Sequence, residues 1–113
     1  MSSSYNTNNL YPKPGIFNGT YLLGSNLVVD ATAGGVQIAS SFFTQNDQFV
    51  LVFLDIQTAN VWVTFDGSTP ASGNGHLLVA GEKYFWPRSK AQAAKFLRST
   101  GTSGSVYCTP HEV

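Results

Sequence analysis

The chain has 113 residues, with six basic and six acidic side chains that give a formal net charge of zero. This length fits one domain with a single hydrophobic core. Charged residues make up 11% of the sequence, against about 25% in an average globular domain. So little charge excludes the strongly basic surface that binds nucleic acids or anionic membranes. It also leaves the surface poorly protected against association, which favours contact with another protein.

The first 15 residues, MSSSYNTNNLYPKPG, show no apolar repeat at the spacing of a strand or a helix. Pro12 and Pro14 keep the chain extended. We expect residues 1–15 to form an extended arm that becomes ordered on a neighbouring subunit, with Leu10 and Tyr11 as anchors. A disordered terminus is the alternative. At about 3.3 Å per residue the arm reaches about 50 Å. It lacks the charged and apolar regions of a secretion signal.

Residues 16–113 are expected to form a single β domain. Short apolar runs between turn residues predict strands near residues 16–17, 21–23 and 27–30. Alternation from Val36 onward predicts another strand, which ends at Phe42-Phe43. The run from Phe49 to Ile56, FVLVFLDI, is apolar on both faces and therefore predicts a strand in the middle of the structure.

Val61 to Phe65 follows after a short connection, and the two runs predict the clearest hairpin in the chain. Val61, Val63 and Phe65 share one face of this strand, and Trp62 lies on the other. Trp62 is expected to be structural. If the second face is also covered, its replacement by alanine costs about 3–5 kcal/mol.

The rest of the chain predicts two further strand pairs after a long turn of Gly, Ser, Pro and Asn. The pairs are residues 77–79 with 83–86 and residues 95–99 with 105–109. Ser89–Ala94 leans towards helix but is too short to be stable alone. About eight short strands at roughly ten-residue spacing indicate an all-β fold, an antiparallel β-sandwich with jelly-roll-like topology.

The sequence predicts no catalytic, cofactor or metal site. The spacing of His76 and Glu82 resembles half of a cupin metal motif, but Leu78 occupies the position of the second histidine. Two ligands do not hold a transition metal firmly. Cys108 is expected to be a small buried side chain, because its nearest base, His111, lies beyond a proline. No two carboxylates have a spacing that guarantees a shared acid–base site.

An aromatic cluster beside a cation, Tyr84-Phe85-Trp86-Pro87-Arg88, is the candidate contact region. Tyrosine, tryptophan and arginine dominate protein interfaces. We therefore expect Tyr84, Trp86 and Arg88 to contribute to a protein interface. Two alternatives remain: Phe85 packs inward while Tyr84 and Trp86 cover a sheet edge, or the cluster stacks on a sugar.

The order of strands and turns from Val61 to Thr109 resembles that of a known class of proteins. This stretch reads VWVTFDGSTPASGNGHLLVAGEKYFWPRSKAQAAKFLRSTGTSGSVYCT. It resembles small all-β virion proteins of tailed bacteriophages, of the head decoration or cement type. The resemblance implies a non-enzymatic homotrimer, made in the host cytoplasm, that binds the major capsid protein on the outer head surface and stabilises the shell. The alternatives are a tail-associated receptor- or carbohydrate-binding module and a degenerate cupin-like enzyme.

Overall fold

A computed structural model describes residues 24–45 and 51–111. The predicted arm and the strands expected near residues 16–17 and 21–23 lie outside the described residues. The strands are β2 (Ser25–Val29), β3 (Leu51–Gln57), β4 (Val61–Thr64), β5 (His76–Leu78), β6 (Lys83–Pro87), β7 (Lys95–Arg98) and β8 (Gly104–His111). The helices are α1 (Ser40–Gln45) and α2 (Arg88–Ala93).

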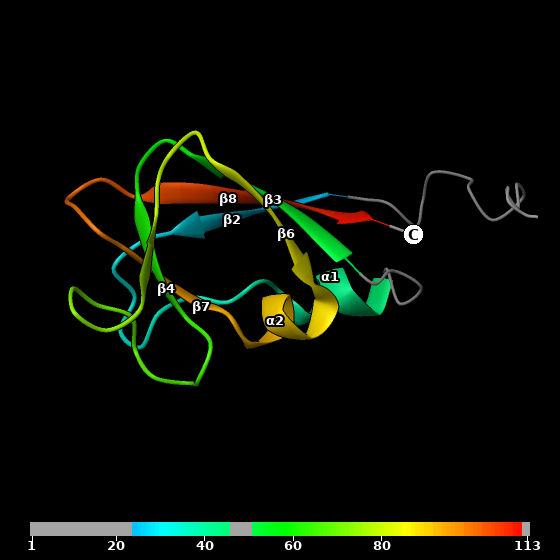
Figure 1. Cartoon of the computed structure of the whole chain (residues 1–113), viewed down its shortest axis with the longest axis horizontal. Coiled ribbons are helices and arrows are strands. Elements are labelled where there is room, and N and C mark those ends of the chain that lie inside the picture. The colour runs from blue at the N-terminus through cyan, green and yellow to red at the C-terminus, as the bar shows by residue number, and fades with distance from the viewer. Residues whose placement is uncertain (1–23, 46–50, 112–113) are drawn as a thin grey trace, which may run out of the picture.

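The described strands form two antiparallel sheets (Figure 1). Sheet one has the order β2-β8-β3-β6, and sheet two has the order β5-β4-β7. In Figure 1, sheet one lies above β4 and β7, and the two helices lie at one end of the sandwich. The predicted all-β antiparallel sandwich is confirmed.

Strict alternation along β3 and β8 builds the core between the sheets. Every second residue of β3 is buried, and the same holds for β8 from Gly104 to Pro110. This is the pattern of strands with one covered and one open face. Phe96 of β7 is fully buried and stacks on Trp86 of β6, with ring centres 6.1 Å apart. The largest fully buried side chains are Phe96, Leu54, Ile56, Val29, Val52, Val61, Val63, Val106 and Pro70.

The three predicted strand pairs do not form, because consecutive strands lie in different sheets. β3 pairs with β6 and β8, whereas β4 pairs with β5 and β7. β5 and β6 also lie in different sheets, and so do β7 and β8. Thr58 has a positive φ of 75° in the short link from β3 to β4, which turns the chain from one sheet to the other. β3 lies between β8 and β6 inside sheet one, but only one of its faces is buried, so the burial on both faces that its apolar run predicts is not met in the described chain.

The strand predicted from Val36 to Phe43 is also wrong. Val36 alone forms a β-bridge, to Phe96, and the chain then enters helix α1. Phe42 and Phe43 are both buried, at 2% and 5% exposure. A strand sends neighbouring side chains to opposite faces, so one of the two rings would be exposed. A helical turn places both towards the core.

Helix α2 forms in the region where the sequence predicts a weak tendency towards helix. It begins directly after Pro87, the last residue of β6. Ala91 is buried within it, and Ala94 is buried just after it. A six-residue helix has little stability of its own, so this packing holds it in place.

Candidate interaction surfaces

Strand β6 sends its aromatic side chains to opposite faces. Trp86 pairs with buried Val52 and Tyr84 with buried Leu54, so both point towards the core. Trp86 is 5% exposed, whereas Phe85 is 56% exposed. The burial of Trp86 does not fit its expected interface role, and the alternative in which Phe85 packs inward is wrong. Alternation within β6 separates Phe85 from its neighbours, but only the partner strand shows which face is inside.

Arg88, the third predicted interface residue of this region, holds the two helices together. Its Nη2 donates a hydrogen bond of 2.9 Å to the carbonyl oxygen of Phe43. Its guanidinium carbon also lies 5.7 Å from the centre of the Phe43 ring. These contacts give Arg88 a structural role between α2 and α1. The other two predicted interface residues, Leu10 and Tyr11, lie outside the described residues.

A groove of about 320 Å³ opens between β5 and β6, where the two sheets part. Its walls include Phe65, His76, Tyr84 and Trp86, and Lys90 of α2 reaches over it. The Lys90 Nζ lies 4.8 Å from the ring centre of Phe65 and 5.3 Å from that of Trp86. Such contacts are cation–π interactions. The groove thus combines aromatic walls with one cation.

Tyr84 is fixed at the wall of this groove by a polar contact. Its hydroxyl donates a 2.5 Å hydrogen bond to Oε1 of Glu82. This bond, reinforced by burial and by the nearby carboxylate charge, raises the pKa of Tyr84 to about 12. The hydrogen bond to Glu82 thus holds the Tyr84 ring at the wall of the groove.

A second hollow, of about 370 Å³, adjoins the groove and shares Phe65 and His76 with it. Asp66 and Asn74 also line it. Both side chains form hydrogen bonds within their own loop. Asp66 accepts hydrogen bonds from the backbone N–H and the hydroxyl of Ser68, which lower the pKa of its carboxyl. Asn74 Nδ2 donates to the Thr69 carbonyl at 2.8 Å. These contacts are those of turn-forming residues.

The outer face of sheet two carries an apolar row across all three strands. Trp62 of β4 lies opposite Leu77 of β5 on one side and opposite Leu97 of β7 on the other. Leu77 is 42% exposed, and Trp62 and Leu97 are partly exposed. We call these three residues the apolar stripe. The prediction that the Trp62 face is covered is not met within the described chain.

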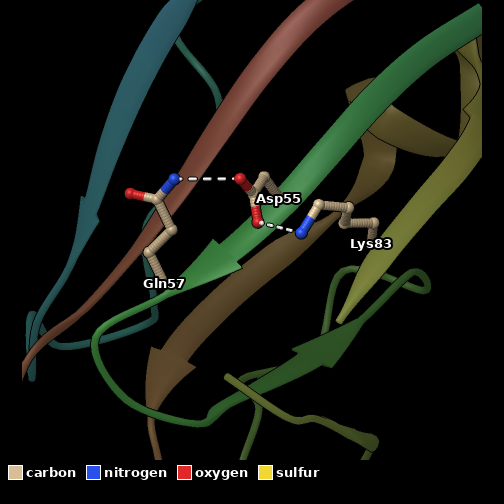
Figure 2. A network of polar contacts seen from close by, with 3 residues as sticks. All are labelled: Asp55, Gln57 and Lys83. Carbon is tan, nitrogen blue, oxygen red and sulfur yellow. Dashed lines mark hydrogen bonds and ion pairs between the residues drawn. The ribbon is translucent and has the colours of Figure 1, made fainter. Parts of the chain in front are cut away.

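The outer face of sheet one is divided into an aromatic and a polar end. At one end Phe85 lies between two rings, 4.9 Å from Phe53 and 5.5 Å from His111, centre to centre. We call Phe53, Phe85 and His111 the aromatic end. Towards the other end, Lys83 lies 3.5 Å from Asp55, which also accepts a 3.0 Å hydrogen bond from Gln57 (Figure 2). A closed polar network therefore borders an exposed aromatic cluster.

The groups considered for chemistry are not brought together in the described chain. Residues 24–45 and 51–111 contain no cluster of three or more metal-ligating side chains. Burial raises the pKa of the Cys108 thiol to about 12 and keeps it protonated, which makes it a poor nucleophile. His111 does not approach Cys108, because its ring lies edge-on to Phe85 on the outer face while Cys108 is buried in the core.

No protein-family model, no curated protein and no solved structure matches the chain. In the part of the chain that the structure describes, no helix is long and apolar enough to cross a membrane.

Proposed function

We propose that this protein is a non-enzymatic decoration protein of a tailed-phage head, which binds the outer surface of the shell and stabilises it. The observation that carries the proposal is the apolar stripe of Trp62, Leu77 and Leu97 on the open face of sheet two. A tryptophan flanked by two leucines is a suitable anchor for a protein contact. The sequence resemblance names the partner class, the major capsid protein.

The strand order supports a jelly-roll topology, the finer part of this proposal. Val36 exchanges two backbone hydrogen bonds of 2.8 Å with Phe96 and so adds a minimal strand beside β7. We number the strands of the described chain in sequence order, with β2 first, the Val36 segment second and β8 eighth. Sheet one then has the order first-eighth-third-sixth, and sheet two has the order second-seventh-fourth-fifth. Two interleaved Greek keys, which make a jelly roll, produce this order.

The proposed mechanism is mechanical. Each bound protein spans neighbouring capsid subunits, which lie side by side only in the assembled shell. Because the protein binds the assembled shell and not the separate subunits, its binding free energy adds to the stability of the shell. A homotrimer multiplies this effect, because three stripes act together at a high effective concentration. Residues 1–15 extend the contact to neighbouring subunits. No titratable group has to change its state, and no substrate is consumed.

The test is Leu77→Asp, which places a carboxylate in the middle of the proposed contact. Burying an unpaired charge is costly, so we expect loss of binding to shells that lack the protein, and loss of the heat resistance that the wild type restores. Val28→Asp is the matched control, because Val28 is an exposed aliphatic residue on the opposite sheet, at 56% exposure. Equal binding by the two variants, with both folded, would count against the stripe as the shell contact.

The groove favours a second candidate, a tail-associated carbohydrate-binding module. Sugars stack on aromatic rings, and Phe65 and Tyr84 present rings beside the polar groups of His76 and Lys90. The two functions differ in copy number, because decoration proteins are abundant in a virion and tail tips are scarce. Mass spectrometry of purified particles measures this number. Glycan binding that disappears in His76→Ala, together with a low copy number, would favour the second candidate.

A further inference from the structure

The loop between β4 and β5, residues 65–75, is held closed by Asn74. Its side-chain Nδ2 donates a hydrogen bond of 2.8 Å to the Thr69 carbonyl oxygen and one of 3.1 Å to Oγ of Ser68. The backbone of Asn74 also exchanges hydrogen bonds of 2.9 and 3.0 Å with that of Ala71. These bonds tie the end of the loop, where the chain enters β5, to its middle.

The two partners of the Asn74 side chain both act as acceptors. A carbonyl oxygen has no proton to give, and the Ser68 hydroxyl already donates its proton to Oδ1 of Asp66 at 2.5 Å. Position 74 must therefore supply two protons, which an amide does and an ionised carboxylate does not. An aspartate there would direct its oxygens at two acceptor oxygens. It would also compete with the Asp66 carboxylate for the Ser68 hydroxyl.

The next residue, Gly75, is restricted just as strongly. It has a φ of 121°, and a Cβ atom there would overlap the carbonyl oxygen of Val63. Only glycine adopts such a conformation without strain. The fold therefore requires asparagine followed by glycine at this place, and both residues are exposed to solvent.

Asparagine is chemically labile when glycine follows it, because glycine has no side chain to hinder attack by its own backbone nitrogen. Hydroxide removes the proton of the Gly75 backbone nitrogen, which then attacks Cγ of Asn74. The new N–Cγ bond forms, the Cγ–Nδ2 bond breaks, and Nδ2 takes a proton from water and leaves as ammonia. Water then opens the succinimide ring at either carbonyl carbon and yields aspartate or isoaspartate. No oxidant or reductant takes part.

We propose that Asn74 is a deamidation site and that its modification irreversibly opens the β4–β5 loop. The closed loop slows the reaction, because the bonds to Thr69 and Ser68 hold the departing Nδ2 and the bonds to Ala71 restrain the backbone rotation that ring closure needs. Once formed, the acid cannot donate the two lost hydrogen bonds, so the loop stays open. The proposal does not depend on the function proposed above, because it concerns the chemistry of one chain.

The position of Asn74 gives this reaction a structural reach. Asn74 lines the second hollow together with Asp66 and His76, and β5 begins at His76. Leu77 of the apolar stripe is the second residue of that strand. Deamidation therefore alters the chain at the border of both candidate surfaces.

Peptide mapping by mass spectrometry tests the proposal on the full-length protein, after incubation in mildly alkaline buffer that keeps it folded. The peptide with Asn74 is expected to show the mass of the acid and to contain isoaspartate. Ser68→Ala removes one acceptor of the Asn74 amide and is expected to speed the reaction about two- to tenfold, the factor that corresponds to the net free energy of one hydrogen bond. Asn26 is the internal control, because it is exposed but is followed by leucine, and it is expected to stay unmodified.

A second measurement does not depend on the folding of Ser68→Ala. Asn74→Asp imitates the product, and hydrogen exchange at the backbone of Ala71 is expected to be at least about fivefold faster in it, because two donated hydrogen bonds are lost. Asn26→Asp makes the same chemical change on the opposite sheet and is expected to leave this exchange unchanged. An intact Asn74 under conditions that modify it in the urea-unfolded chain would overturn the proposal. Equal exchange at Ala71 in Asn74→Asp and the wild type would do so as well.

Discussion

Trp62 lies between Leu77 and Leu97 on an open face and is only partly buried. Its replacement by alanine is therefore expected to lower the free energy of unfolding by about 2 kcal/mol, below the 3–5 kcal/mol of a fully buried aromatic. Phe96→Ala is the comparison, because Phe96 has no exposed surface. Urea denaturation of both variants measures the difference. A loss for Trp62→Ala as large as that for Phe96→Ala would show that the stripe is covered in solution.

Cys108 makes the stability of the fold sensitive to alkali. Burial raises its pKa from the ordinary 9.0 to about 12. Between these values the unfolded chain loses the thiol proton and the folded chain keeps it. The free energy of unfolding is therefore expected to fall as pH rises above 9, with a slope of up to about 1.4 kcal/mol per pH unit from this group. Well below pH 9 Cys108 contributes no pH dependence, because the thiol is protonated in both the folded and the unfolded chain.

Cys108→Ala separates this contribution from that of Tyr84, whose pKa is also raised to about 12. Urea denaturation at several pH values from 8 to 11 should show a shallower decline for the variant than for the wild type. Parallel curves would mean that the Cys108 thiol ionises in the folded protein much as it does in the unfolded one.

At the scale of elements, the β4–β5 connection depends on Gly75. Gly75 has a φ of 121°, and a Cβ atom there would overlap the carbonyl oxygen of Val63. Gly75→Ala is therefore expected to cost more than about 3 kcal/mol, since backbone strain adds to the overlap. Gly73→Ala is the control, because its φ of 83° brings strain but its Cβ would meet open space. Its expected cost is about 1 kcal/mol. Thermal unfolding that ranks the two variants the other way would contradict this account.

Most strand positions followed from local pattern, but strand partners did not. Within the described residues, the predicted run from Phe49 to Ile56 matches β3 from Leu51 onward, and Val61 to Phe65 matches β4. Alternating apolar residues show that a segment is a strand with a covered face. They do not show whether a short link reverses the chain within a sheet or carries it to the facing sheet. The links after β3, β5 and β7 carry the chain to the facing sheet.

The candidate site was predicted less well than the fold, for the same reason. Tyr84, Trp86 and Arg88 were chosen by residue type, and the structure places Trp86 in the core and Arg88 against Phe43. The apolar stripe joins residues from three strands that are far apart in the sequence. Only the register brings Trp62, Leu77 and Leu97 into one row, and register is not readable from any one segment.

At the scale of the whole molecule, the arm and the domain are expected to be separable. Deleting residues 1–14 should leave a folded domain, because the core of the described chain uses residues from Val29 onward. The deletion is expected to weaken trimer formation and shell attachment. Native mass spectrometry and binding to undecorated shells measure the two effects, with circular dichroism as the control for folding. Unaltered assembly and attachment would show that the arm contributes to neither.

The central position of β8 has a consequence for how the protein is made. Ser25 pairs with Cys108, which is 83 positions later in the chain, and β8 separates β2 from β3. Until β8 has been synthesised, β2 has no partner strand in the described sheet one, and β3 pairs on one side only, with β6. A nascent chain on the ribosome therefore cannot complete sheet one before β8 emerges, and the folding rate is limited by contacts between distant residues. Premature termination before β8 would leave two apolar strand edges open, which is the arrangement from which aggregates grow.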